Sequence, residues 1–165
     1  MSSGEGGGSI VVRPAGEPDL PALGRLGAAL LHAHFAFDAK RFMAPPSQPE
    51  DGYAWFLGTQ LRQPGVCILV AADGDEVVGY VYAALEPHSW KELREAAGFI
   101  HDVAVAEAHR GRGIGRLLVT GASEWLRAHG APRVMLWTAE RNTGARRLFT
   151  RLGFRTTMVE MTREL

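Results

Sequence analysis

The stretch HRGRGIGRLL, residues 109–118, combines three arginines and three glycines with the start of an apolar helical pattern. A strand-like run, FIHDVAVA at residues 99–106, comes directly before it. A strand that enters a helix through a glycine-rich turn leaves backbone N–H groups free at the positive end of the helix dipole. The pattern therefore predicts an anion-binding turn. The spacing Arg-x-x-Gly-x-Gly over residues 110–115 fits a diphosphate held by main-chain amides, with arginines closing over its charge.

Two better-known phosphate loops do not fit this stretch. No Gly-Lys-Ser/Thr follows the glycines, which excludes a nucleoside triphosphatase loop. The dinucleotide fingerprint places its glycines after the first strand of a parallel unit, whereas these glycines follow a fourth strand. The remaining alternative is a tight turn with solvated arginines.

Working outward from the turn, apolar periodicity and turn residues predict the order β-α-α-β-β-β-α-β-α-β, an α/β fold with a mixed sheet covered by helices. Asp73-Gly74 predicts a hairpin, and Asn142 predicts a helix N-cap. The predicted strands are 10–13, 66–73, 76–85, 99–106, 133–139 and 154–162; the predicted helices follow residue 19, span 50–62, and run from 114 to about 128 and from 142 to about 153.

The 165 residues, 46% of them hydrophobic, suit one globular domain, predicted over residues 10–165 after a flexible Gly/Ser leader at 1–9. Eighteen basic and 18 acidic residues cancel, so no global field favours nucleic acid or a membrane. The longest apolar run, 66–72, is too short to span a bilayer. Cys67 is the single cysteine, and the six histidines form no metal-ligand pattern. We expect a cytoplasmic protein without a metal.

Three stretches together resemble the GNAT superfamily of acetyl-CoA-dependent N-acetyltransferases: VGYVYA at 78–83, HDVAVAEAHRGRGIGRLL at 101–118 and NTGARRLFTRLGF at 142–154. The resemblance covers roughly residues 10–163. It implies a mixed, mostly antiparallel central sheet with helices on both faces. It also implies transfer of an acetyl group from acetyl-CoA to a primary amine, with acetyl-CoA as the acyl donor.

The same resemblance assigns the donor site. The backbone of Val103, Ala104 and Val105 pairs with the pantetheine arm between two splayed strands, and the Val103 amide polarises the thioester carbonyl. Asn142 and the Phe149 ring contact the cofactor, and Arg146 or Arg147 could meet its 3′-phosphate. The amides that hold the pyrophosphate are those of Arg110, Gly111, Arg112, Gly113, Ile114, Gly115 and Arg116.

An acceptor amine is almost wholly protonated at neutral pH, so a base must remove a proton. His101 is the best candidate, because imidazole titrates near neutral pH and the residue precedes the cofactor-binding stretch. A chain of water molecules is the alternative, with Glu92 and Glu95 as weaker candidates. Strand alternation predicts that Asp102 points to the opposite face and has a structural role.

Many relatives carry a tyrosine where this chain has Phe149, and that hydroxyl protonates the departing thiolate. Either solvent replaces it, or Tyr53, Tyr80 or Tyr82 does; our hypothesis is that no tyrosine acid is essential. Cys67 lies in an apolar strand, which favours direct transfer in a ternary complex over an acyl-cysteine intermediate.

The resemblance places the acceptor site among the first two helices and the loop after the third strand, at 32–42, 53–56 and 86–92. Asp38, Glu86 and Glu92 could hold a cationic amine there, whereas the aromatic residues of these stretches fit equally well in a core. The acceptor stays open among a small-molecule amine, an amino acid, an aminoglycoside, and a protein N-terminus or lysine.

Three further interpretations follow. Because the tyrosine is absent, a non-catalytic acyl-CoA-binding or sensing module is the main alternative to an enzyme. Nucleic-acid binding has weaker support, from arginines between residues 141 and 155. The last strand, 154–162, could pair two subunits in a homodimer, as it does in relatives.

Overall fold

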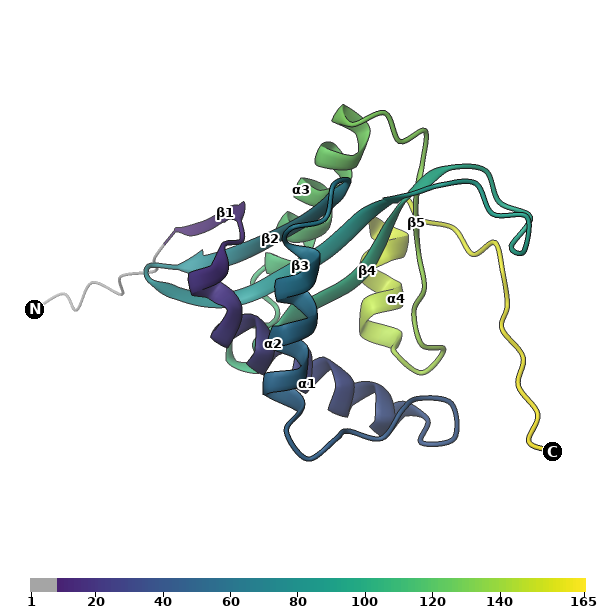
Figure 1. Cartoon of the computed structure of the whole chain (residues 1–165), viewed down its shortest axis with the longest axis horizontal. Helices are drawn as coiled ribbons and strands as arrows, with labels where there is room; N and C mark the ends of the chain where they lie inside the picture. The colour runs from purple at the N-terminus through teal and green to yellow at the C-terminus, as the bar shows by residue number, and fades with distance from the viewer. Residues whose placement is uncertain (1–8) are drawn as a thin grey trace, which may run out of the picture.

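The computed structural model describes residues 9–165 as a five-stranded sheet in the order β1-β2-β3-β4-β5, with helices on both faces (Figure 1). The predicted fold is confirmed apart from its last strand. The strands are β1 (Ile10–Pro14), β2 (Val66–Asp73), β3 (Glu76–Glu86), β4 (Ala97–Val105) and β5 (Val134–Leu136). The helices are α1 (Leu20–Phe37), α2 (Pro49–Gln60), α3 (Ile114–Ala128) and α4 (Thr143–Arg151), with short 3-10 turns at Glu17–Asp19 and Glu107–His109.

Strands β1 to β4 are antiparallel, and β5 runs parallel to β4. The predicted hairpin joins β2 to β3, with Gly74 at a φ of +61° in its turn. Strand β5 is shorter than predicted and pairs with β4 only over residues 98–100. Beyond that point β4 continues without a neighbour on this side.

Helices α1 and α2 cover one face of the sheet (Figure 1). Their core contains Leu23, Leu57 and Tyr80, each with no exposed surface. The two helices approach closely at two glycines of α1: a Cβ on Gly24 would lie 2.5 Å from the Glu50 carbonyl oxygen, and one on Gly27 would lie 2.0 Å from the Tyr53 ring. Small residues at these positions bring α2, and with it Tyr53, close to the sheet.

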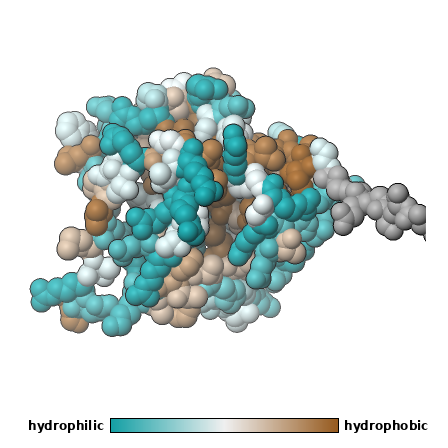
Figure 2. Space-filling view, turned by 180° about the vertical axis from the view of Figure 1, so that it is seen from behind, coloured by the Kyte–Doolittle hydropathy of each residue, from teal (hydrophilic) through white to brown (hydrophobic). Residues whose placement is uncertain are grey.

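Helices α3 and α4 cover the opposite face, where Ile114, Leu118 and Leu126 pack on β3 and β4. Apolar residues recur at helical spacing along α3 and form its buried face. The outward side of this layer carries mainly polar side chains (Figure 2). A continuous apolar contact therefore fixes α3, and its N-terminal turn, against the sheet.

A β-bulge interrupts the pairing of β3 with β4. Tyr82 pairs with Asp102 and Ala83 pairs with Ile100, so His101 has no partner on β3. An extra residue in one strand shifts the alternation of side chains by one position. His101 and Asp102, predicted on opposite faces, consequently both contact tyrosines on the α1–α2 side of the sheet. The prediction for Asp102 is wrong in this respect.

The predicted last strand, residues 154–162, is not present; this segment is extended and pairs with no strand among the described residues. Met158, Val159 and Met161 are exposed. A segment of strand-favouring residues becomes a strand only where it can pair with the edge of a sheet. The short β5 offers few backbone groups for such pairing. The predicted leader, residues 1–9, lies outside the described residues except for Ser9. None of the helices within residues 9–165 has the length and apolar character that a membrane crossing requires.

Candidate active site

The site begins where β4 and β5 separate, because their pairing ends at Ile100 and Leu136. The N–H of Gly98 donates to Arg133 O at 2.9 Å on the β5 side, and the N–H of Ala106 donates to Val78 O at 2.8 Å on the β3 side. Since successive amides of a strand point to alternate sides, the N–H groups of Val103 and Val105 point away from β3. They face the gap that β5 leaves, as the sequence predicts for a segment that pairs with an extended ligand.

The glycine-rich turn continues from this open edge. Gly111 and Gly113 have φ angles of +76° and +79°, a conformation that glycine adopts without strain. Gly113 is the N-cap of α3, and no side chain caps the helix. Within the described residues, the N–H groups of residues 111–116 donate to no backbone or side-chain acceptor. Six free amides at the positive end of a 15-residue helix are the donors that the predicted anion site requires.

Two of the three arginines in this turn are already held by neighbouring groups. Nε of Arg110 donates to Val105 O at 3.2 Å, and Nη1 of Arg112 donates to Asp73 Oδ2 at 3.1 Å. Arg112 and the nearby His109 ring, 3.8 Å from the same Asp73 oxygen, attach the turn to the β2–β3 hairpin. Main-chain amides, with the exposed Arg116 beside them, are therefore the principal groups that this turn offers to an anion.

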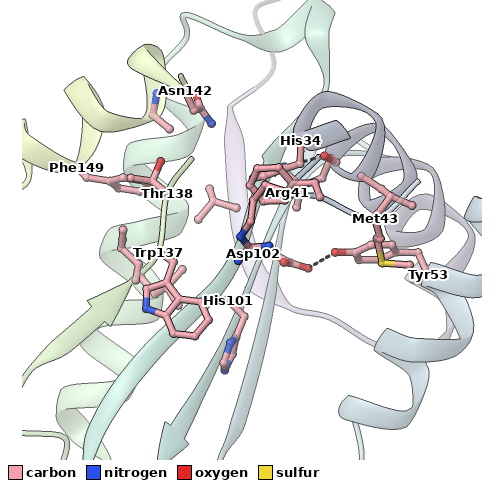
Figure 3. Close-up of a pocket in the computed structure, with 17 residues that line it drawn as sticks. His34, Arg41, Met43, Tyr53, His101, Asp102, Trp137, Thr138, Asn142 and Phe149 are labelled. Carbon is pink, nitrogen blue, oxygen red and sulfur yellow. Dashed lines mark hydrogen bonds between the residues drawn. The ribbon is translucent and has the colours of Figure 1, made fainter. Parts of the chain in front are cut away.

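A cavity of about 470 Å³ opens at the gap between β4 and β5 (Figure 3). It brings together four of the predicted site residues: His101, Val103, Asn142 and Phe149. The other lining residues are Leu30, Leu31, His34, Arg41, Phe42, Met43, Tyr53, Ile100, Asp102, Leu136, Trp137, Thr138 and Ala145.

Only some of the elements in which the sequence predicts an acceptor site line this cavity. Helices α1 and α2 and the loop between them contribute to the cavity, but residues 86–92 do not line it. Trp55, in the predicted stretch 53–56, is 72% exposed and belongs neither to the cavity nor to the core. The loop after β3 instead forms, with the start of β4, an arm that projects from the body (Figure 1).

His101 lies at the cavity with its ring between aromatic neighbours. Its ring stacks on Phe99 at a centroid distance of 5.0 Å and lies 4.9 Å from the Tyr82 ring. Nε2 is 3.0 Å from Glu86 Oε1. A carboxylate on one ring nitrogen fixes the orientation of an imidazole, so the second nitrogen is free to exchange a proton.

Asp102, which strand alternation assigned to the wrong face, also lines the cavity. Its Oδ2 accepts hydrogen bonds from the hydroxyls of Tyr53 and Tyr80, each at 2.9 Å. Burial raises the pKa of Asp102, and the two tyrosine hydrogen bonds oppose that rise. No short motif signals this cluster, because its members lie on α2, β3 and β4.

Asn142 and Phe149, the two cofactor candidates beyond β4 and its turn, lie at the N-cap of α4 and within α4. Asn142 is the predicted N-cap: its Oδ1 accepts from the Ala145 N–H at 3.1 Å. Phe149 is 9% exposed and forms an edge contact with Phe154. Its ring reaches the cavity without a hydroxyl.

The hydroxyls of the three tyrosines are all engaged. Tyr82 donates to Gln60 at 3.0 Å, and Tyr53 and Tyr80 donate to Asp102.

Residues 30–154, more than half of the chain, match the acetyltransferase (GNAT) family. The chain belongs to the acetyltransferase (GNAT) family. Among curated proteins of related sequence, mycothiol acetyltransferase of Beutenbergia cavernae is 33% identical over 133 residues, which cover 74% of this chain and 40% of that protein. Streptothricin acetyltransferase of Streptomyces lavendulae is 36% identical over 87 residues, covering 53% of this chain and 42% of that protein. This GNAT chain thus spans less than half the length of these relatives.

Solved structures share the fold of this GNAT protein. A Bacillus halodurans protein described as a transcriptional regulator matches with a TM-score of 0.74 at 24% identity, over 95% of this chain and 100% of that one. Aminoglycoside N-acetyltransferase AAC(6')-Iy, solved in complex with CoA, matches with a TM-score of 0.75 at 16% identity, over 96% of each chain. At these identities the likeness concerns the fold.

Proposed function

We propose that this protein is an N-acetyltransferase that moves an acetyl group from acetyl-CoA directly to a primary amine in a ternary complex. One observation carries the proposal: among the described residues, the Val103 and Val105 amides have no partner at the β4–β5 gap, and the free amides of residues 111–116 follow them after one short 3-10 turn. In acetyl-CoA, an extended pantetheine arm that contains amides leads to a diphosphate. The arm matches the open edge of β4, and the diphosphate matches the turn that follows it in the chain.

The donor is held mainly by backbone. Val103, Ala104 and Val105 would pair with the pantetheine arm, and the turn amides of residues 111–116 would bind the pyrophosphate. The Arg110 amide, also expected there from the sequence, already donates to Glu107 O at 3.2 Å. Asn142 and Phe149 would contact the same molecule from α4. The Val103 amide would donate a hydrogen bond to the thioester oxygen as negative charge develops there.

The reaction converts an ammonium and a thioester into an amide, a thiol and one proton released to solvent. The ammonium first loses a proton, which His101 accepts at its free ring nitrogen while Glu86 holds the other. The amine lone pair then forms the N–C bond, and the C–S bond breaks with its electrons on sulfur. The nitrogen then releases its second proton to solvent, and the thiolate takes up one proton.

The proton for the thiolate comes from solvent in this proposal. Phe149 carries no hydroxyl, and the hydroxyls of Tyr53 and Tyr80 are engaged with Asp102. Burial and the Asp102 charge raise the pKa of Tyr53, so this phenol is a poorer acid than an exposed one. Replacing Tyr53 or Tyr82 singly with Phe should therefore leave measurable turnover; its complete loss, with cofactor binding intact, would refute the solvent pathway.

A small-molecule amine is the acceptor class that the comparisons support. The names of the curated relatives specify mycothiol and streptothricin acetyltransferases, and a cavity of about 470 Å³ has the size of a small-molecule site.

The decisive experiment combines calorimetry of acetyl-CoA binding with a thiol-release assay against a panel of amines. We expect binding of acetyl-CoA and release of thiol that depends on an added amine. Absence of acetyl-CoA binding by the folded protein would refute the proposal.

The substitution at Phe149 favours one second candidate, a non-catalytic acyl-CoA sensor. Such a protein would bind acetyl-CoA and release no thiol with any amine. The same assay therefore separates a sensor from an enzyme.

We further propose that two copies associate through residues 154–162. The exposed Met158, Val159 and Met161 of this unpaired extended segment support the proposal. Light scattering should give a dimer for the full chain and a monomer for a chain that ends at residue 153.

The single, buried cysteine supports the expected cytoplasmic location.

A further inference from the structure

The cavity wall carries opposite charges at two places. Asp102 reaches it from β4, and Arg41 reaches it from the loop between α1 and α2 (Figure 3). The apolar part of the wall near Arg41 is formed by the side chains of Leu30, Leu31, Phe42 and Met43. A molecule with one cationic end, one anionic end and an apolar body would match this arrangement.

Arg41 already holds a carboxylate supplied by the chain itself. Its Nε donates to Glu160 Oε1, and its Nη2 donates to Glu160 Oε2 at 2.9 Å. The two-point geometry is the one with which arginine recognises carboxylates. The guanidinium carbon lies 5.0 Å from the centroid of the Phe42 ring, which helps to orient the planar group. Glu160 is 119 residues away in sequence, in the extended C-terminal segment, and is itself well exposed.

Asp102 keeps one oxygen available. Both tyrosine hydrogen bonds go to Oδ2, and within residues 9–165 no group donates to Oδ1. The side chain of Asp102 lines the cavity. Among the described residues, Arg41 pairs with Glu160 and Asp102 pairs with the two tyrosines, and no hydrogen bond joins Arg41 to Asp102. Both side chains line the cavity, so each can take its own group of a ligand.

Building on the proposed acetyl transfer, we propose that the acceptor is a primary amine that also carries a carboxylate, such as an amino acid with an apolar side chain. Asp102 binds the ammonium through Oδ1 next to His101, and Arg41 binds the carboxylate with both donors. Glu160 occupies Arg41 until the acceptor carboxylate displaces it. An amine without a carboxylate would leave the Arg41–Glu160 pair in place and would use only half of the site.

The test compares acceptors that differ only in the carboxylate: phenylalanine and leucine against their carboxamides. We expect kcat/KM to be at least about tenfold higher for the acids, because a two-point hydrogen bond between charged groups is strong. In Arg41→Gln this ratio should fall toward one. Arg41→Lys, which retains the charge without the planar fork, should give an intermediate ratio.

Glu160→Gln tests the competing carboxylate. Removing its charge should lower KM for the acids, since they no longer displace an ion pair, while the KM of the carboxamides should stay the same. Arg25→Gln is the matched control, because Arg25 is an exposed arginine of α1 that does not line the cavity. This variant should retain the wild-type ratio.

The outcomes distinguish this inference from the function on which it rests. A ratio near one in the wild type, or an unchanged ratio in Arg41→Gln, would overturn the assignment of a carboxylate while acetyl transfer itself stands. An unchanged KM for the acids in Glu160→Gln would refute the displacement of Glu160. If acetyl-CoA does not bind, the proposed function fails and the acceptor assignment fails with it.

Discussion

At the scale of single residues, the bulge in β4 is the feature with the largest consequence. It places His101 and Asp102, neighbours in the chain, on one side of the sheet and at one cavity. Their environments differ: His101 contacts the carboxylate of Glu86, whereas Asp102 accepts two tyrosine hydroxyls. In the proposed reaction the first side chain accepts a proton, and the second holds the positive charge of the acceptor.

The role of His101 predicts a loss of turnover when its imidazole is replaced. In His101→Gln, kcat/KM should fall about 100-fold, because glutamine can bond to Glu86 but cannot accept a proton. Steady-state kinetics with an amine that the wild type acetylates checks this, and calorimetry of acetyl-CoA binding is the control for folding. An unchanged kcat/KM would assign the proton transfer to another group or to water.

At the scale of secondary structure elements, the contact between α1 and α2 decides where Tyr53 lies. Gly27→Ala should destabilise the protein by about 2 kcal/mol, because its Cβ would lie 2.0 Å from the Tyr53 ring and must displace it. The same displacement should weaken the hydrogen bond from Tyr53 to Asp102. Urea unfolding measures the first effect, and acceptor KM measures the second.

Gly52→Ala in α2 is the control for that prediction. A Cβ at Gly52 would meet no atom within 4 Å, so alanine should be neutral or should stabilise the helix by up to about 1 kcal/mol. Equal destabilisation by both substitutions would contradict the role of the Tyr53 contact, because helix propensity favours alanine at both positions.

The turn before α3 is the second element with a testable geometry. Gly113 has a φ of +79°, so Gly113→Ala should cost about 1–2 kcal/mol in backbone strain and should raise the Kd for acetyl-CoA about tenfold as the amides move. Gly144→Ala, near the start of α4 with nothing within 4 Å of its Cβ, should leave this Kd unchanged. Calorimetry with both variants decides the matter. An unaltered affinity in Gly113→Ala would contradict the proposed pyrophosphate site.

At the scale of the whole molecule, the titratable groups in its interior predict how stability depends on pH. Burial raises the pKa of Tyr53, Tyr80 and Tyr82 above 10 and that of Cys67 to about 11. A pKa that is higher in the folded than in the unfolded state contributes stability that is fully present below the unfolded value. That contribution is lost as the pH rises through the folded value.

The melting temperature should therefore fall steeply above about pH 10, and the three tyrosines should ionise together with unfolding. Ultraviolet absorbance of tyrosinate, recorded alongside circular dichroism during an alkaline titration, tests this. The thiol of Cys67 should likewise resist alkylation at about pH 8 until denaturant is added. Tyrosinate that forms while the circular dichroism stays native would contradict the burial of these hydroxyls.

The sequence by itself determined the features that rest on local backbone chemistry. Asp73-Gly74 suffices for the β2–β3 hairpin, Asn142 suffices as the N-cap of α4, and the glycines of 109–118 produce free amides at the start of α3. Each depends on the conformational preferences of a few adjacent residues. The glycine-rich turn could therefore be predicted from these residues, and the family from the resemblance of three sequence stretches.

Only the tertiary structure decided the register of β4 and the acceptor end of the cavity. The bulge at His101 arises from how β3 and β4 align, and alternation along one strand cannot reveal it. The partners of Asp102 come from α2 and β3, and Arg41 meets Glu160 across most of the chain. Residues 154–162 have the composition of a strand, but the edge strand β5 has only three residues to pair with. Such features depend on which surfaces meet in three dimensions, and that information is not present in any single stretch of sequence.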